Sequence, residues 1–113
     1  FRRVLFRSKE KLNMDALRVV GNLDANIKKV AVVTGSGADL AKKAQRSGAD
    51  VLITGDVKYH DAQDAVDAGM CIIDCNHFES EDIFKDVMKR FLDDIEDISV
   101  IKSSLNINPF SIL

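Results

Sequence analysis

The chain has 113 residues, of which 46% are hydrophobic, and a formal net charge of -2, so it can form one domain with a core of its own. The balanced charge argues against the basic surface of a nucleic-acid-binding protein, and we expect no nucleic-acid partner. Its apolar runs are much shorter than the roughly 20 residues needed to cross a bilayer, and the sequence carries no signal-peptide pattern. These features predict a cytoplasmic protein with no membrane partner.

Residues 1–8, with the sequence FRRVLFRS, show no helix or strand period that continues into the residues after them. They resemble the translation of a sequencing adapter, so we predict a non-native leader at 1–8 and exclude it from the fold. On this interpretation residues 9–113 are the C-terminal part of a longer, two-part α/β protein.

Short segments rich in β-branched residues alternate with amphipathic segments along the rest of the chain. The predicted strands are residues 17–20, 29–33, 51–54, 70–75 and 98–101. The predicted helices are residues 38–47, 58–68 and 80–95. Gly48 and Gly69 should end the first two helices. Because strands linked by helices pair in parallel, the pattern predicts an α/β fold with a mostly parallel sheet and helices on its faces.

The last predicted helix, residues 80–95, carries the clearest apolar stripe. The stripe consists of Ile83, Phe84, Val87, Met88, Phe91, Leu92 and Ile95. Such a period is typical of a helix that packs on a core or at an interface.

Two cysteines lie in the predicted strand 70–75. Cys71 and Cys75 are about 13 Å apart at the rise of a strand, which is too far for a disulfide. We expect both to be buried in a reducing compartment. Cys75 and His77 also form a Cys-x-His pair, but no second pair completes a structural zinc site.

The strongest candidate site follows the same strand. Asp74, His77 and Glu81 can all bind a metal ion or transfer a proton, and the spacing of His77 and Glu81 places them on one face of a helical turn. A buried strand before them would put them at the carboxyl edge of the sheet, where open α/β folds bind ligands. The pattern indicates a divalent-cation site, or else an N-cap carboxylate beside a structural histidine. Asp74 should either orient His77 or accept hydrogen bonds from turn amides.

Two other strand-to-helix turns should reach the same edge. The turn Gly35-Ser36-Gly37 presents amides that could bind an anion. Leu40 stands where a dinucleotide fingerprint has its last glycine, so a sterically required turn is favoured. In the next turn, His60 beside Asp61 is a candidate ligand, helix cap or catalytic acid or base. Asp56 is predicted to be an N-cap acceptor.

Five segments, taken together and in order, resemble a known family. They are Gly35-Ser36-Gly37, Gly48-Ala49-Asp50-Val51, Thr54-Gly55-Asp56-Val57-Lys58-Tyr59-His60-Asp61-Ala62, Asp74 to Glu81, and Asn108-Pro109-Phe110. From about Leu17 to Phe110 the chain is similar to the C-terminal part of the GTP cyclohydrolase I type 2 homologs, a family of dinuclear-metal proteins. Cys75-Asn76 replaces the family's Ala-Gly and Thr34 one of its glycines, and neither change removes a ligand.

The resemblance implies that His77 and Glu81 are metal ligands in a site for two divalent ions, Zn, Fe or Mn. It implies that the other ligands come from an N-terminal portion without a counterpart here, and that the full-length protein self-associates as a homo-hexamer. With two ligands only, this chain should bind metal poorly. The implied function is a metal-dependent hydrolase of a small, nucleotide-like substrate. The resemblance assigns no role to His60, which is a candidate acid or base from its place in the sequence alone. The alternative is a non-catalytic metal-binding scaffold.

Overall fold

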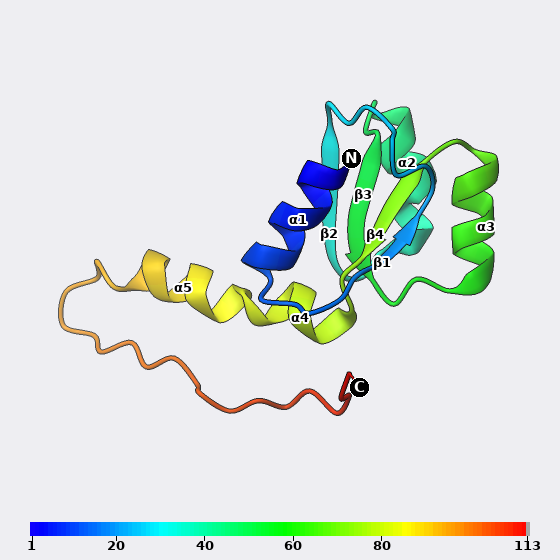
Figure 1. Ribbon diagram of the computed structural model, residues 1–113. Helices are drawn as coiled ribbons and strands as arrows, with labels where there is room; N and C mark the ends of the chain where they lie inside the picture. Colours follow the sequence, from blue (N-terminus) through cyan, green and yellow to red (C-terminus); the bar gives the residue numbers. More distant parts are fainter. Residues whose placement is uncertain (113) are drawn as a thin grey trace. The chain divides into compact units, whose positions relative to one another are not determined.

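The computed structural model describes residues 1–112. Two compact units follow one another along the chain, Phe1–Glu81 and a second unit that begins at Asp82. The first unit is an α/β sandwich around one four-stranded sheet (Figure 1). No helix among the described residues is long and apolar enough to cross a membrane.

The sheet has the order β1-β4-β3-β2. Its strands are β1 (Arg18–Val20), β2 (Val30–Ser36), β3 (Val51–Gly55) and β4 (Cys71–Asp74). β2, β3 and β4 pair in parallel, whereas β1 pairs antiparallel with β4. The prediction of an α/β fold with a mostly parallel sheet is confirmed.

Side-chain alternation along the strands divides the core between the two faces of the sheet. Leu52 and Ile72 belong to the larger cluster, which includes alanines of η1 (Ala38–Leu40), α2 (Ala41–Arg46) and α3 (Tyr59–Asp67). Their strand neighbours, Val51 and Ile73, pack on the opposite face. Successive residues of a strand point to opposite faces, so two fully buried strands require two covered faces. Alanine on the helices lets α2 and α3 approach the sheet closely.

Residues 2–8 are part of a helix, which corrects the exclusion of this segment from the predicted fold. α1 (Arg2–Lys11) places Phe1, Val4 and Leu5 against the cluster on its face of the sheet. The amino group of Phe1 also donates a hydrogen bond of 2.9 Å to the carbonyl oxygen of Ala25. The spacing of these three apolar residues matches one face of a helix, and their burial supplies the stabilisation that a short helix needs.

The C-terminal part differs from the sequence prediction in two places. The predicted helix 80–95 is divided into α4 (His77–Asp82) and α5 (Phe84–Leu92) at Ile83, whose ψ of -17° is nearer a 3₁₀ turn than an α-helix. The predicted strand 98–101 is wrong, since these residues pair with no strand within residues 1–112. A strand needs a hydrogen-bonded neighbour, and the chain described here offers this segment none.

The apolar stripe of α5 is not part of a core, because no residue of this helix is buried. Phe84 is 63% exposed and Phe91 73% exposed. An interface role for this stripe stays a prediction.

Candidate metal centre

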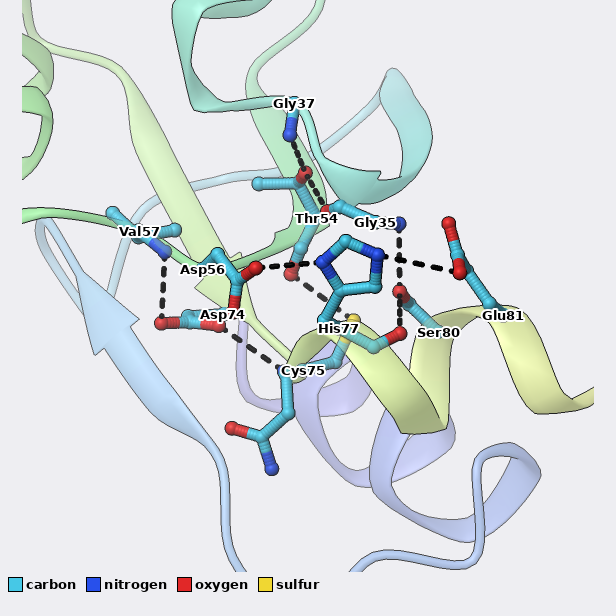
Figure 2. A network of polar contacts seen from close by, with 11 residues as sticks. Gly35, Gly37, Thr54, Asp56, Val57, Asp74, Cys75, His77, Ser80 and Glu81 are labelled. Atoms are coloured by element: carbon cyan, nitrogen blue, oxygen red, sulfur yellow. Dashed lines mark hydrogen bonds and ion pairs between the residues drawn. The ribbon is translucent and has the colours of Figure 1, made fainter. Parts of the chain in front are cut away.

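The carboxyl ends of the three parallel strands supply the candidate site. Parallel pairing brings the ends of β2, β3 and β4 to one edge of the sheet. Asp56 follows β3 directly, His77 and Glu81 lie on α4 just after β4, and Gly35 lies near the end of β2. Figure 2 shows these residues grouped around the His77 ring.

The imidazole of His77 lies between two carboxylates. Its Nδ1 is 2.6 Å from Oδ2 of Asp56, and its Nε2 is 3.3 Å from Oε2 of Glu81. All three side chains are about half exposed. An ionised carboxylate can only accept a hydrogen bond, so this contact favours a proton on Nδ1, with the N–H group donating a hydrogen bond to Asp56. The structure therefore brings His77 and Glu81 together, facing one another across one helical turn (Figure 2).

These carboxylates set the protonation of the ring. The hydrogen bond that His77 donates to Asp56, followed by the charge of Glu81, raises the pKa of His77 above its ordinary value of 6.5. A proton on Nε2 would be shared with Glu81. When that proton leaves, Nε2 and the carboxylate oxygen are two acceptors facing each other, an arrangement that a cation between them stabilises.

A pH dependence of stability follows from this shift. Because the pKa of His77 is higher in the folded chain than in the unfolded chain, its contribution to the free energy of unfolding is complete below pH 6.5. That contribution is lost as the pH rises through the folded-state pKa. We expect urea unfolding of the metal-free chain to show this loss, and His77→Gln to remove it. An identical pH profile in both proteins would contradict the expectation.

The site fits one side of a metal centre. Two ligand atoms of a tetrahedral zinc ion, each about 2.1 Å from the metal, lie about 3.4 Å apart, and Nε2 of His77 is 3.3 Å from Oε2 of Glu81. Gly35 leaves space beside both atoms, since a Cβ there would lie 2.5 Å from Oε1 of Glu81 and 3.2 Å from Nε2 of His77. No group of three or more His, Cys, Asp or Glu side chains in residues 1–112 could hold one ion. The described residues thus bring together two side chains that could bind a metal ion, His77 and Glu81.

Two hydroxyl groups tie the end of β2 to the other two strands. Ser80 Oγ accepts a 2.8 Å hydrogen bond from the amide of Gly35 and donates one to the carbonyl of His77. The buried Thr54 Oγ1 accepts from the amide of Gly37 and donates to the carbonyl of Gly35. The pairing of β2 and β3 shifts between Val32 and Ser36, where Gly35 has a φ of +65°. This bulge lets the β2 backbone approach α4 closely.

Asp56 contacts His77, and Asp74 takes the second of the two roles expected of it. Asp74 bonds the turn amides, accepting from the amides of Asn76 at 3.1 Å and Val57 at 3.3 Å, and it pairs with Arg18. Asp56 makes no cap for α3, whose N-terminus has no side-chain cap hydrogen bond, and instead contacts His77. The N-cap prediction for Asp56 is therefore wrong. One signal in the sequence could have indicated this contact: Asp56 directly follows β3, the strand that pairs with β4.

The structure separates the remaining candidates from this contact network. Cys75 is buried, its thiol lies 3.1 Å from the carbonyl oxygen of Thr54, and burial raises its pKa to about 11, so it is a poor thiolate ligand. Both cysteines are free, as expected. His60 lies in the first turn of α3, exposed and edge-on to the Tyr59 ring at 5.5 Å. The contacts that join His77, Asp56 and Glu81 do not include it.

Comparison with known proteins gives consistent matches. A GTP cyclohydrolase 1 type 2 homolog of Staphylococcus aureus strain MSSA476 is 41% identical over 107 residues, which cover 90% of this chain. The crystal structure of Staphylococcus aureus protein SA1388 superposes with a TM-score of 0.86 at 41% identity, over 93% of this chain and 36% of that one. A Bacillus cereus protein related to NIF3 gives a TM-score of 0.82 at 35% identity, with 93% and 30% covered.

The chain is much shorter than the relatives it matches. It spans 29% of the length of the curated Staphylococcus aureus relative. The model of the family described as Duf34/NIF3 (NGG1p interacting factor 3) matches residues 1–109, nearly the whole sequence. The resemblance to GTP cyclohydrolase type 2 homologs is confirmed, and the chain belongs to the Duf34/NIF3 family.

Proposed function

We propose that this chain supplies one side of a dinuclear metal centre, with His77 and Glu81 as its ligands. The observation that carries the proposal is the 3.3 Å approach of Nε2 of His77 to Oε2 of Glu81, beside a glycine whose Cβ would crowd both atoms. An N-cap carboxylate beside a structural histidine would not require that space. Nitrogen and carboxylate oxygen together suit Zn, Fe or Mn.

The reaction class proposed for the complete protein is hydrolysis of a small, nucleotide-like substrate. Two divalent cations, when bound, would lower the pKa of a water molecule and polarise the bond attacked. In this chain His77 and Glu81 would bind the ions. His60 is exposed in the first turn of α3 and is proposed as the acid or base that exchanges a proton with solvent or substrate.

Metal titration tests the ligand pair. We expect Zn²⁺ or Mn²⁺ to bind this chain with a dissociation constant above micromolar, because two protein ligands fall short of the usual three or four. His77→Ala and Glu81→Ala should each weaken the binding strongly, and the matched His60→Ala should leave it unchanged. Calorimetry measures the affinity of each protein, and the NMR shifts of the His77 ring follow binding in the proteins that keep this side chain. Undiminished binding in His77→Ala would contradict the proposal, as would submicromolar affinity of the chain alone.

A non-catalytic role is the alternative, and one observation favours it. The apolar stripe of α5 is exposed, which is typical of an interface, so a metal-bound homo-hexamer that recruits partners is a second proposal. A full-length relative that carries these residues separates the two. Turnover of a nucleotide or phosphoester that is lost in His77→Ala, with assembly intact, supports the hydrolase. Equal background rates in both proteins support the scaffold.

A further inference from the structure

Asp56 stands out because its contact with His77 links two turns that lie 21 residues apart in sequence. We infer that Asp56 is a positioning residue for the proposed metal centre: it holds His77 in the tautomer and orientation that aim the Nε2 lone pair at the metal position beside Glu81. The inference rests on the proposed function and names a residue that its ligand set does not contain.

The two nitrogens of a neutral imidazole differ, since one carries the proton and the other a lone pair. Oδ2 of Asp56, 2.6 Å away, is an acceptor and therefore selects the tautomer with the proton on Nδ1. The lone pair is left on Nε2, which faces Oε2 of Glu81 (Figure 2). In the other tautomer an N–H group would point at the metal position, and no metal could bind there. A carboxylate on the distal nitrogen of a ligating histidine also makes the ring a better donor.

The backbone holds Asp56 and His77 in register, so their contact does not depend on long side chains. Asp56 has a φ of +54°, in the left-handed region. The residue before it, Gly55, packs so tightly that a Cβ there would lie 2.4 Å from the carbonyl oxygen of Asn76 and 2.8 Å from the amide of His77. The end of β3 and the start of α4 are therefore in direct contact. A short carboxylate at position 56 then lies within hydrogen-bond distance of the ring.

An ordinary surface ion pair would have different consequences. Both side chains are about half exposed, and exposed pairs contribute little to stability. If Asp56 positions His77, loss of its carboxylate should change the tautomer of His77 and the metal affinity without a matching change in stability. If Asp56 has no such role, its loss should change neither the tautomer nor the metal affinity.

Asp56→Asn is the most informative variant, because asparagine tolerates a positive φ and keeps the side-chain shape. Its amide is a weaker acceptor and can also donate to Nδ1. Asp97→Asn is a matched control, since Asp97 is an exposed aspartate with a φ of +65° in the second unit. ¹⁵N NMR of the metal-free chain, at a pH above the pKa of the ring, reports the tautomer, and Zn²⁺ titration reports affinity.

We expect the wild type and Asp97→Asn to keep the proton on Nδ1, and Asp56→Asn to shift it toward Nε2 with a loss of zinc affinity of roughly 10–100-fold. A wild-type ring with its proton mainly on Nε2 would overturn the inference, and this measurement needs no variant. Equal zinc affinities of Asp56→Asn and Asp97→Asn would also overturn it. Failure of the wild type to bind zinc at all would instead count against the metal centre, while the tautomer would still decide the role of Asp56.

Discussion

Gly55→Ala is expected to lower the free energy of unfolding by about 3 kcal/mol, the upper part of the usual range for overpacking a buried position. Gly55 is buried at the end of β3, and a Cβ there would lie 2.4 Å from the carbonyl oxygen and 2.5 Å from the carbonyl carbon of Asn76. These are backbone atoms, which cannot rotate away as a flexible side chain can. Relief of the clash requires β3 and the start of α4 to separate. Urea unfolding of the wild type and the variant measures the difference.

Gly69→Ala is the matched control for this substitution. Gly69 has a φ of +70°, and a Cβ at this position would meet no atom within 4 Å beyond its chain neighbours, so alanine there carries only the cost of the left-handed backbone, about 1–2 kcal/mol. Gly55→Ala should therefore be clearly the more destabilising of the two. Equal losses would show that the chain relaxes around position 55 without moving α4. The contact that aligns Asp56 with His77 would then lose its structural support.

The elements of the sheet were predictable because burial leaves a local pattern. The predicted strands 51–54 and 70–75 are mostly apolar, and β3 and β4 are buried on both faces, as a central parallel strand requires. The helix-linked order of the strands gave their parallel pairing. The antiparallel pairing of β1 with β4 carried no such signal, because it depends on the path of the loop between β1 and β2.

The misassigned segments show where local pattern is not enough. Phe1, Val4 and Leu5 do have helical spacing, but the resemblance of this segment to an adapter hid it. Residues 98–101 have the alternation of a strand, yet extended backbone becomes a strand only when another strand accepts its hydrogen bonds. Within residues 1–112 no such strand is paired with it. The exposed stripe of α5 likewise needs a second surface, here an apolar one, before its residues can be buried.

The candidate site was predictable only in the part that is local in sequence. His77 and Glu81 meet because residues four apart share a helix face. The contact between His77 and Asp56 depends on the register of β3 and β4, in which Thr54 lies opposite Asp74. That register places the residues after the two strand ends side by side. No spacing rule within one element reveals such a contact, and an N-cap was the more common interpretation of an aspartate before a helix.

Gly35→Ala is expected to weaken zinc binding roughly 100-fold, at the upper end of the losses caused by disturbing the groups that support a metal ligand. A Cβ at position 35 would lie 2.5 Å from Oε1 of Glu81 and 3.2 Å from Nε2 of His77. The carboxylate of Glu81 is the end of a flexible side chain, so it can swing away with little cost to the fold. It then no longer faces Nε2. The effect of the crowding should therefore appear in zinc affinity, measured by calorimetry, while stability should fall only by the cost of the left-handed backbone.

Gly48→Ala separates crowding from backbone strain in this experiment. Gly48 also has a positive φ, +85°, but its Cβ would meet only Nζ of Lys29, at 3.9 Å. Both variants carry the left-handed cost of about 1–2 kcal/mol, and only Gly35→Ala crowds His77 and Glu81. Zinc affinities that fall equally in the two variants would show that strain, not the space beside His77, governs binding.

A double-mutant cycle with Glu81→Ala identifies which ligand the new methyl group displaces. If the methyl group acts by moving Glu81, it can cause little further loss once that carboxylate is absent, so the two substitutions should be strongly non-additive. Additive losses would place the effect on the 3.2 Å approach to Nε2 of His77 instead. Because Gly35 is held to α4 through Ser80 and to β3 through Thr54, the space it leaves is a fixed part of the edge of the sheet. The effect of filling the space beside Gly35 on zinc affinity is therefore a direct test of where the zinc ion binds.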